Sequence, residues 1–469
     1  MTAAAARLLE PRYLAALGVL FVAAAIGALS GYDPKIAIAA SLGLAFVLIA
    51  LGDLAFGIAV FATLTYLELA PIAGGGPAVS FAKLAGLTLG ISWIAALASR
   101  SGRSRMFFSA HPGMTAALGF FAAWTALSLL WTEDQEPTVV AFTRLVLNMA
   151  LIPIVFTGLQ EARHLRWVAA GIVAGAGLAA AYGLLGAPSV AEAGDLNRIA
   201  GTVGDPNLLA SVLVVGLVMA MTLLLDAKRS IATRGISAGV GILCMAAIFA
   251  TASRGGIVAM AAALVAAVVL AGPRRGRMAF LATSVVVLAV GYFAVFASTA
   301  QVERLTTADG GAGRTDIWQV GWRMAQAEPL HGVGAGNFPI SSVHYLLVEP
   351  GAIDRADFIV DRPAVAHNTY LEILAELGIV GLVLMLTFIL IGLLAAIRAA
   401  WAFDRVGEDG LSLIARGVAV GLISVLAADF FLSNQVGKLL WLLIALGPAM
   451  LAIARRMESE SAATSGREA

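Results

Sequence analysis

Long apolar runs, each ended by a short polar or charged break, recur along the whole chain. Many of these runs reach the roughly 18 to 20 apolar residues that a helix needs to cross a bilayer. The pattern predicts membrane spans near residues 13–30, 35–51, 53–70, 79–98, 112–131, 141–159, 166–186, 203–226, 234–252, 255–271, 277–297, 368–397, 411–431 and 436–454. Because some of these segments are short, we expect an all-α, polytopic transmembrane helical bundle of about 12–14 spans.

The composition supports a membrane protein. Of the 469 residues, 60% are apolar and 13% are charged. Soluble domains carry about 25% charged residues, so a soluble enzyme is excluded, and the continuous apolar windows exclude a disordered chain. The one cysteine, Cys244, lies inside a predicted span, which excludes an intramolecular disulfide and a thiolate metal site.

The distribution of lysine and arginine predicts the orientation in the membrane. Basic residues fall in alternate breaks, and the other short breaks are neutral or acidic, as in residues 131–137. Because cytoplasmic loops carry the excess of basic residues, both termini are predicted to be cytoplasmic. The basic breaks contain Arg100, Arg103, Arg105, Arg163, Arg166, Lys228, Arg229, Arg234, Arg274, Arg275, Arg277, Arg398, Arg405, Arg455 and Arg456.

This orientation divides the chain into four regions. They are a transmembrane bundle with the first 11 spans (1–297), a large periplasmic loop containing short helices (298–366), the last transmembrane spans (367–454) and a cytoplasmic disordered tail (455–469). The first span follows Arg7 and Arg12 and lacks a small-residue cleavage site, so we expect a retained anchor, not a signal peptide.

Polar residues at the outer boundary are the candidate functional residues, because charges at membrane depth are costly and usually serve a function. Arg198 lies just before a span that Asp205 and Pro206 are predicted to begin as N-cap and first helical residue. Arg198 is either a snorkelling interface arginine or a ligand-binding residue. Arg254, flanked by Ser253 and two glycines, either marks a simple helical hairpin or binds an anion between two spans.

An amphipathic helix is predicted within the large loop. Ile317, Val320, Gly321 and Met324 recur at helical spacing, and Trp318 precedes Trp322 by one turn. Such a helix is suited to lie on the bilayer surface. Arg314 and Arg323 would then face lipid headgroups or a phosphate, and Thr315 or Asp316 would cap the helix.

The glycine-rich run at residues 331–338 follows this helix. It has no Lys-Ser/Thr pair and no βαβ context, so it does not fit a nucleotide-binding loop, and we expect a turn.

A single histidine stands where the long loop ends and a span begins. A neutral imidazole at such a boundary can accept a proton near neutral pH, which makes His367 a candidate general base, although a simple polar helix end is the alternative. Asn368 and Thr369 are candidate cap or orienting residues. Glu372 and Glu376 share a helix face and are expected to pair with Arg314, Arg362 or Arg416. No cluster of His, Asp or Glu has metal-ligand spacing, so no metal and no other cofactor is predicted.

These residues together favour the handling of a phosphorylated lipid at the outer leaflet. Guanidinium groups bind phosphate oxygens bidentately and stay charged. A diphosphate leaving group needs its developing charge stabilised, and one base is enough to activate an acceptor hydroxyl.

The sequence resembles the O-antigen ligase and O-antigen polymerase superfamily of bacterial polytopic membrane glycosyltransferases. The resemblance covers about residues 195–380 and depends on the order of five motifs. They are Arg198-x-x-Gly-Thr-x-Gly-Asp-Pro-Asn-Leu208, Ser253-Arg254-Gly255, Gly313-Arg314-Thr-Asp-x-Trp318, Pro329-x-x-Gly-x-Gly-x-Gly-Asn337-Phe338 and His367-Asn-x-Tyr370-x-Glu372-x-x-x-Glu376-x-Gly378.

The resemblance implies transfer of a glycan from an undecaprenyl-diphosphate carrier, at the periplasmic face of the inner membrane. Ligases and polymerases of the superfamily share these motifs. A single large outer loop with a surface helix suits a membrane-embedded acceptor, so we expect a ligase that transfers the glycan to a lipid A-core hydroxyl. The resemblance also implies an inverting reaction that needs neither nucleotide nor metal. His367 would be the general base, and Arg198, Arg254 and Arg314 would bind the diphosphate, with Asn368, Tyr370, Glu372 and Asp316 as supporting residues.

Three alternatives stay open. An O-antigen or exopolysaccharide polymerase would extend the carrier-linked chain and share the same motifs. A transporter for lipid-linked sugars would also have many spans and cationic residues, but its coupling residues would lie near the bilayer midplane. A scaffold subunit of an export complex would not depend on His367.

Overall fold

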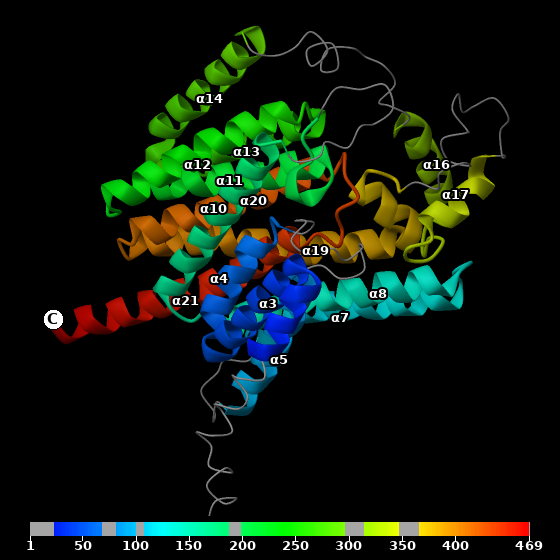
Figure 1. Ribbon diagram of the computed structural model, residues 1–469, viewed down its shortest axis with the longest axis horizontal. Coiled ribbons are helices and arrows are strands. Elements are labelled where there is room, and N and C mark those ends of the chain that lie inside the picture. Colours follow the sequence, from blue (N-terminus) through cyan, green and yellow to red (C-terminus); the bar gives the residue numbers. More distant parts are fainter. Residues whose placement is uncertain are drawn as a thin grey trace, which may run out of the picture.

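The computed structural model describes residues 23–67, 81–99, 107–186, 198–295, 314–346 and 365–468, and within these ranges it contains helices and no strand (Figure 1). After a short helix at Ala23–Tyr32 the first half contains α3 (Pro34–Gly52), α4 (Leu54–Leu64), α5 (Phe81–Ser99), α6 (Phe107–Ala110), α7 (Pro112–Leu127), η1 (Ser128–Leu130), α8 (Gln135–Met149), α9 (Leu151–Gly158), α10 (Ala162–Leu184) and η2 (Gly201–Val203). The second half contains α11 (Pro206–Leu225), α12 (Ile231–Ala250), α13 (Arg254–Leu270), η3 (Gly272–Arg274), α14 (Arg275–Val295), α16 (Arg314–Ala327), α17 (Phe338–Leu346), α19 (Thr369–Arg405), α20 (Asp409–Ala428) and α21 (Lys438–Glu468).

The predicted fold class is confirmed. In the described part of the chain, nine helices are long and apolar enough to cross a membrane: Pro112–Leu130, Gln135–Gly158, Ala162–Leu184, Pro206–Leu225, Ile231–Ala250, Arg275–Val295, Thr369–Arg405, Asp409–Ala428 and Lys438–Ala463. Five further apolar helices are shorter: Ala23–Tyr32, Ala40–Gly52, Leu54–Leu64, Leu84–Ala98 and Arg254–Leu270. Each predicted span therefore overlaps a helix, and the chain is a multi-pass membrane protein built as a helical bundle.

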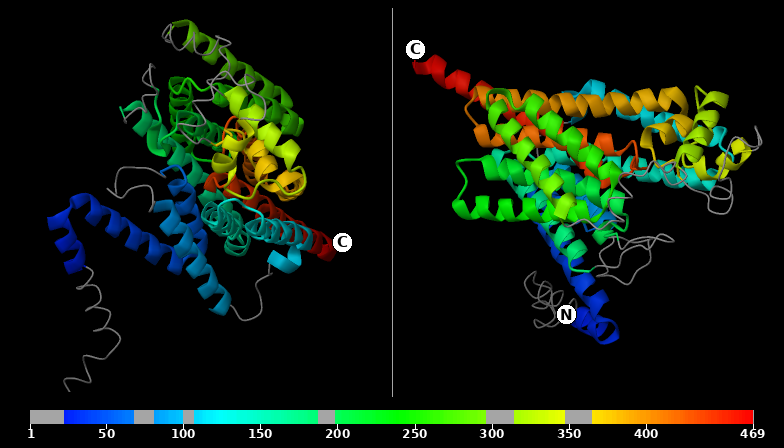
Figure 2. Two further views of the ribbon diagram at one scale, coloured as in Figure 1. Left: turned by 90° about the vertical axis from the view of Figure 1, so that its right-hand side faces the viewer. Right: turned by 90° about the horizontal axis from the view of Figure 1, so that it is seen from above.

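The helices form one bundle with a small cap at one end. Helices α19–α21 run close to the long axis of the molecule, α10–α13 are inclined to it, and α3–α5 lie at one side (Figures 1 and 2). Helices α16 and α17 lie beyond one end of the bundle, and the carboxy terminus lies at the other (Figure 1). Helix α14 packs along α13, and Val285 is its one buried residue. We call the end that carries α16 and α17 the cap end.

Small residues allow the helices to pack closely. A Cβ atom on Gly171 of α10 would lie 2.2 Å from the Ala59 carbonyl oxygen of α4, and Thr63 donates a hydrogen bond of 2.9 Å to the Gly171 carbonyl. A Cβ on Gly447 of α21 would lie 2.1 Å from the Gly392 oxygen of α19. Such contacts between small residues are the usual way to join helices where lipid removes the hydrophobic driving force.

Ion pairs hold the end of the bundle opposite the cap. Asp404, at the end of α19, accepts from Arg416 of α20 at 2.5 Å and lies 3.6 Å from Arg274. Arg416 is buried and also donates to the Leu270 carbonyl at 2.6 Å. The expected pairing of Arg416 with Glu372 or Glu376 is therefore wrong. The two glutamates lie near the start of α19, whereas Arg416 lies beside the end of α19. Arg362 lies outside the described residues.

The carboxy-terminal tail differs from the expectation for residues 455–469. Helix α21 continues to Glu468. Its first exposed turns are anchored by Arg456, which donates to Gln160 at 2.9 Å and 3.2 Å, and by Glu458, which pairs with Arg405 at 2.6 Å. The Met, Glu and Ala residues of this segment are also good helix formers. The prediction of disorder considered only that the segment is polar.

A kink in α19 is the point at which the cap is attached. Gly378 has φ 65° and ψ −170° inside the helix, and a Cβ there would lie 2.2 Å from the Leu330 carbonyl oxygen. The kink leaves helix carbonyls free, and Val333 and Gly334 donate to the carbonyls of Ala375 (2.9 Å) and Glu376 (2.8 Å). The glycine-rich run thus forms a turn that joins the cap to α19 through main-chain atoms.

We expect Gly378→Ala to destabilise the protein. A side chain at positive φ costs about 1–2 kcal/mol, and the clash with Leu330 adds to this. Gly407→Ala is the matched control, because Gly407 has φ 72° but a Cβ there would meet no heavy atom within 4 Å. Thermal unfolding of the detergent-solubilised protein should show a larger drop in Tm for Gly378→Ala. Equal drops would mean that the close approach to Leu330 does not matter.

Candidate active site

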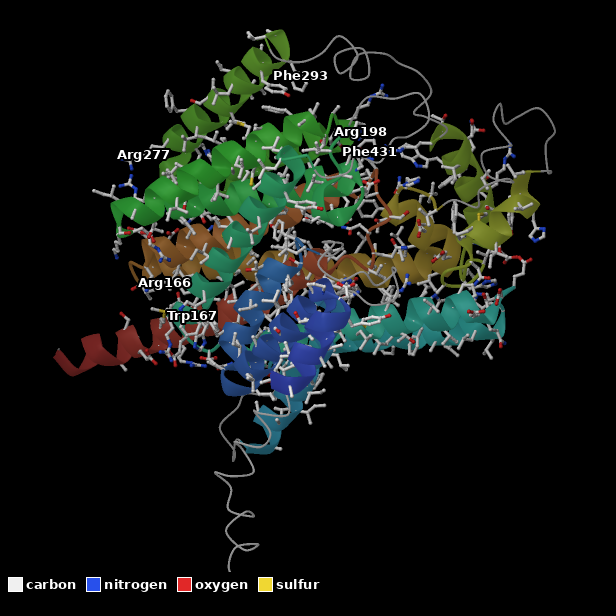
Figure 3. All side chains as sticks on the ribbon, in the orientation of Figure 1. Arg166, Trp167, Arg198, Arg277, Phe293 and Phe431 are labelled. Atoms are coloured by element: carbon white, nitrogen blue, oxygen red, sulfur yellow. The ribbon has the colours of Figure 1, made fainter. Side chains whose placement is uncertain are left out.

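The candidate residues predicted from sequence lie toward the cap end of the bundle. Arg198 and Phe431 appear there together, whereas Arg166 and Arg277 lie at the opposite end (Figure 3). The starts of α11, α13 and α19 lie at this end because the bundle is antiparallel, and these helix starts carry the motifs. Side-chain contacts connect the motifs to one another.

Arg198 is buried and packs against the starts of α11 and α13. Its exposed fraction is 3%, its Nε donates to the Thr251 carbonyl at 2.8 Å, and its Nη2 donates to Asn207 Oδ1 at 3.1 Å. Ser253 donates to the same Asn207 oxygen at 2.8 Å. An arginine that snorkels to the interface would be exposed, so that interpretation of Arg198 does not fit. Asn207 links two of the predicted motifs, a role that its sequence position as a helix-start residue did not indicate.

The predicted start of α11 is confirmed. Asp205 is the N-cap, and its Oδ1 accepts from the backbone N–H groups of Asn207 and Leu208 at 2.8 Å each. Pro206 occupies the first helical position.

Arg254 is the first residue of α13, and Ser253 is its N-cap, accepting from Gly256 N at 3.0 Å. A positive side chain opposes the dipole at a helix N-terminus, so Arg254 does not serve helix stability. Together with the dipole it does favour an anion at this point. Ala252, just before the cap, has φ 47°, a left-handed conformation that is rare for a residue with a side chain and that concentrates at functional sites.

Helix α16 exists, but the prediction that it lies on the bilayer surface is wrong. The apolar side chains of Ile317, Val320 and Met324 are fully buried in the protein. A Cβ on Gly321 would lie 3.0 Å from Phe338 of α17 and 3.1 Å from Leu371 of α19. The same helical periodicity serves a membrane surface or a protein groove, and here the groove is formed by α17 and α19.

Trp318 connects α16 to the neighbouring motifs. Instead of stacking over Trp322, its ring lies 6.2 Å from the ring of Phe431, centroid to centroid. Its Nε1 donates to the Ala366 carbonyl at 3.0 Å, next to His367. Arg314 lies one helical turn before Trp318, at the first position of α16. Phe431 also contacts α13, since a Cβ on Gly255 would lie 3.2 Å from Phe431 Cβ.

His367 directly precedes the N-cap of α19. Its φ is 47°, and its side chain is half-buried. With Ala252, it is one of two non-glycine residues with positive φ in the described part of the chain. Both flank the predicted motifs, which supports a functional role for this region.

The four supporting residues have different roles. Asn368 caps α19, because its Oδ1 accepts from Tyr370 N and Leu371 N at 3.1 Å each. Tyr370 donates to the Leu426 carbonyl at 2.7 Å and packs on Phe430, so it fixes α19 to α20. Glu372 is buried and accepts from Ala366 N at 3.1 Å. Asp316 lies in the first turn of α16, where a negative charge favours the helix.

The loop between α20 and α21, residues 429–437, is the part of the site that the sequence did not reveal. Leu432 accepts from the Thr369 hydroxyl at 2.7 Å, and Gln435 donates to Glu372 at 2.5 Å. Phe431 of this loop lies between α13 and α16. The polar residues that crowd the ends of two spans here were visible in the sequence, but nothing there indicated which motifs they contact.

The arrangement can bind an anion beside a proton acceptor. The starts of α13 and α16 each carry an arginine, and Phe431 contacts both helices between them. His367 follows the residue that Trp318 of α16 holds. In the part of the chain that the structure describes, no group of three or more His, Cys, Asp or Glu side chains is arranged to hold a metal ion.

Comparison with known proteins shows two similarities. Residues 238–386 match the family described as O-antigen ligase. The chain is also 22% identical, over 375 residues, to the exopolysaccharide production protein ExoQ of Rhizobium meliloti (strain 1021). That alignment covers 71% of this chain and 83% of ExoQ. Both similarities support the O-antigen ligase superfamily.

The region that matches the O-antigen ligase family contains most of the candidate site. It runs from within α12 to just beyond the kink of α19, and it includes Arg254, Arg314 and His367. Arg198 lies outside the match and joins the site through Thr251 and Asn207. At the coarse level the chain is therefore an O-antigen ligase-like or polymerase-like membrane enzyme.

Asp429, the first residue of the loop between α20 and α21, has a raised pKa. Its backbone carbonyl accepts from Thr369 N at 2.9 Å, and its carboxyl accepts from Asn434 Nδ2 at 3.0 Å. Burial raises the pKa of Asp429 to about 7, and the Asn434 hydrogen bond opposes this rise only in part.

We therefore expect stability to fall as Asp429 ionises. The pKa of Asp429 in the folded protein lies above the usual value of about 4. The contribution of Asp429 to the free energy of unfolding is therefore complete below about pH 4 and is lost as the pH rises through about 7. Asp429→Asn cannot titrate, so its Tm should rise relative to wild type between pH 5 and about 8. Thermal unfolding of both proteins across this range measures the difference. A difference that does not change with pH would contradict the raised pKa.

Proposed function

We propose that this protein transfers a glycan from undecaprenyl diphosphate to the hydroxyl group of an acceptor glycan, at the periplasmic face of the bacterial inner membrane. The observation that carries the proposal is the connected cluster at the cap end. In this cluster Phe431 packs against the start of α13 beside Arg254, Trp318 packs on Phe431, and Trp318 holds the residue before His367. It combines cations for a diphosphate with a base for a hydroxyl.

Each group has a distinct role in the proposed reaction. His367 removes the proton from the acceptor hydroxyl as its oxygen forms a bond to the anomeric carbon. The bond from that carbon to the diphosphate oxygen breaks, and the negative charge moves to the leaving group. Arg198, Arg254 and Arg314 stabilise this charge. Attack from the face opposite the diphosphate inverts the anomeric centre, and no metal, nucleotide or other cofactor takes part.

The distribution of charge supports the periplasmic location. The end opposite the cap carries the basic breaks, including Arg166, Arg229, Arg274 and Arg405. The positive-inside rule assigns that end, and both termini, to the cytoplasm. The cap end, with the candidate site, then faces the periplasm, where carrier-linked glycans are the available donors.

Two acceptors are candidates. The family description favours a ligase, whose acceptor is the lipid A-core. The name of the relative ExoQ favours a polymerase of an exopolysaccharide or O-antigen, whose acceptor is a second carrier-linked glycan. A surface-lying α16 would have favoured a membrane-embedded acceptor, but its apolar face is occupied by protein, so this argument for a ligase is removed.

The rival classes account less well for the cluster. A transporter of lipid-linked sugars would place its coupling residues near the bilayer midplane in broken helices. Here the arginine and histidine motifs gather at one end of the bundle. A scaffold subunit would have no need of a His367 in the left-handed conformation or of a buried Arg198.

We expect His367→Ala to lower transfer at least about 100-fold, because loss of a general base usually costs two to four orders of magnitude. The assay uses purified protein, undecaprenyl-diphosphate-linked oligosaccharide and lipid A-core, with gel mobility and mass as readouts. His344→Ala is the matched control, because His344 is exposed on α17 and contacts Glu133.

Glycan on lipid A-core would identify a ligase, and a ladder on the carrier would identify a polymerase. Full activity of His367→Ala would contradict the base, and no product from wild type with either acceptor would contradict the proposed transfer.

Arg198→Lys and Arg254→Lys test the recognition of the diphosphate. Lysine keeps the charge but lacks the bidentate fork, and hydrogen bonds to charged groups contribute about 1.5–3 kcal/mol. We therefore expect kcat/KM for the carrier-linked donor to fall roughly 10- to 100-fold. Arg277→Lys, at the opposite end of the bundle, is the control (Figure 3). Wild-type kcat/KM in both site variants would mean that charge alone suffices.

A further inference from the structure

The residue before His367 is held through both of its backbone groups. Ala366 is fully buried, its N–H donates to Glu372 Oε2 at 3.1 Å, and its carbonyl accepts from Trp318 Nε1 at 3.0 Å. The Ala366 carbonyl belongs to the peptide plane that leads into His367. Fixing that plane helps to hold His367 at φ 47°, a conformation that costs about 1–3 kcal/mol and needs support from its surroundings.

Glu372 also binds the loop between α20 and α21. Its carboxylate accepts from the Ser433 hydroxyl and, at 2.5 Å, from Gln435 Nε2, in addition to Ala366 N. These three donors use both carboxylate oxygens. A glutamine at position 372 would have the same shape but only one acceptor oxygen, and its NH₂ group would face donors.

The same loop reaches the arginine motif. Phe431 lies two residues before Ser433, and it packs on Trp318 and against Gly255, the neighbour of Arg254. Glu372 and Trp318 therefore connect the backbone of His367 to the segment that touches the start of α13. This gives the histidine a fixed position relative to Arg254.

We infer that Glu372 and Trp318 are positioning residues that act through the backbone N–H and carbonyl of Ala366 and set the histidine in register with the arginine motif. The inference rests on the proposed function, because it assigns these residues to the reaction that His367 starts. Glu372 touches no reacting atom in this scheme; it holds the backbone that carries the base. Trp318 restrains the same residue through its carbonyl group.

Glu372→Gln and Trp318→Phe test this role with small changes of shape. The first removes acceptor capacity at Glu372, and the second keeps the ring but removes the Nε1 donor. Glu376→Gln is the matched control: Glu376 lies on the same helix, is equally buried, and accepts from Phe338 N at 3.1 Å in the cap and not from the His367 segment. All variants are compared for Tm, kcat, donor KM and the pH profile of the rate.

We expect Glu372→Gln to lower kcat about 10- to 100-fold, because a misplacement near 1 Å costs about that much. Donor KM should stay within about two-fold, and Tm should fall no more than in Glu376→Gln. Trp318→Phe should also lower kcat. A kcat for Glu372→Gln equal to that of Glu376→Gln, at equal Tm, would overturn the inference, and so would a rise in donor KM at unchanged kcat.

A second background separates this inference from the proposed function. If Glu372 acts through His367, Glu372→Gln should cause no further loss in a His367→Ala protein, since residues that act as a unit are not additive. A further loss of about 10-fold there would overturn the positioning role and leave the histidine in place as base. Full activity of His367→Ala itself would instead overturn the proposed function.

Discussion

The attachment of the cap to α19 rests on contacts between main-chain atoms. Helix α19 bends at Gly378, and the bend leaves helix carbonyls without their usual partners. Backbone N–H groups of the turn at residues 330–336 donate to these carbonyls, and the backbone of the turn lies against the kink. This contact holds the chain that follows the end of α16 against α19. Arg314 and Trp318 take their positions from it, and Trp318 in turn restrains the residue before His367.

The loop between α20 and α21 connects the separate parts of the candidate site. The motifs come from helices far apart in the sequence, and it is this loop that touches both α13 and α16. Phe431 provides an apolar bridge between them, and Ser433 and Gln435 provide polar ties to Glu372. A site assembled in this way joins the arginine motif of α13 to the segment before His367 through a third element.

Much of the fold could be predicted from the sequence because hydropathy and helix caps are local signals. The spans follow from apolar length, and Asp205–Pro206 marked the start of α11. For the candidate site, the sequence predicted only that its residues lie at the same boundary of the membrane, and not which of them contact one another. Which helices meet depends on packing, so the roles of Asn207 and Phe431 were not visible. The periodicity of α16 did not say whether its apolar face meets lipid or protein, and polarity alone made the end of α21 look unfolded.

The use of backbone atoms at the cap has a consequence for how such proteins diversify. A joint made of carbonyls, amides and glycines is insensitive to the identity of most side chains around it. The outer surfaces of α16 and α17 can therefore change through mutation while the cap keeps its place on α19. A lineage of such proteins can diverge widely in sequence and still inherit one arrangement of cap and bundle.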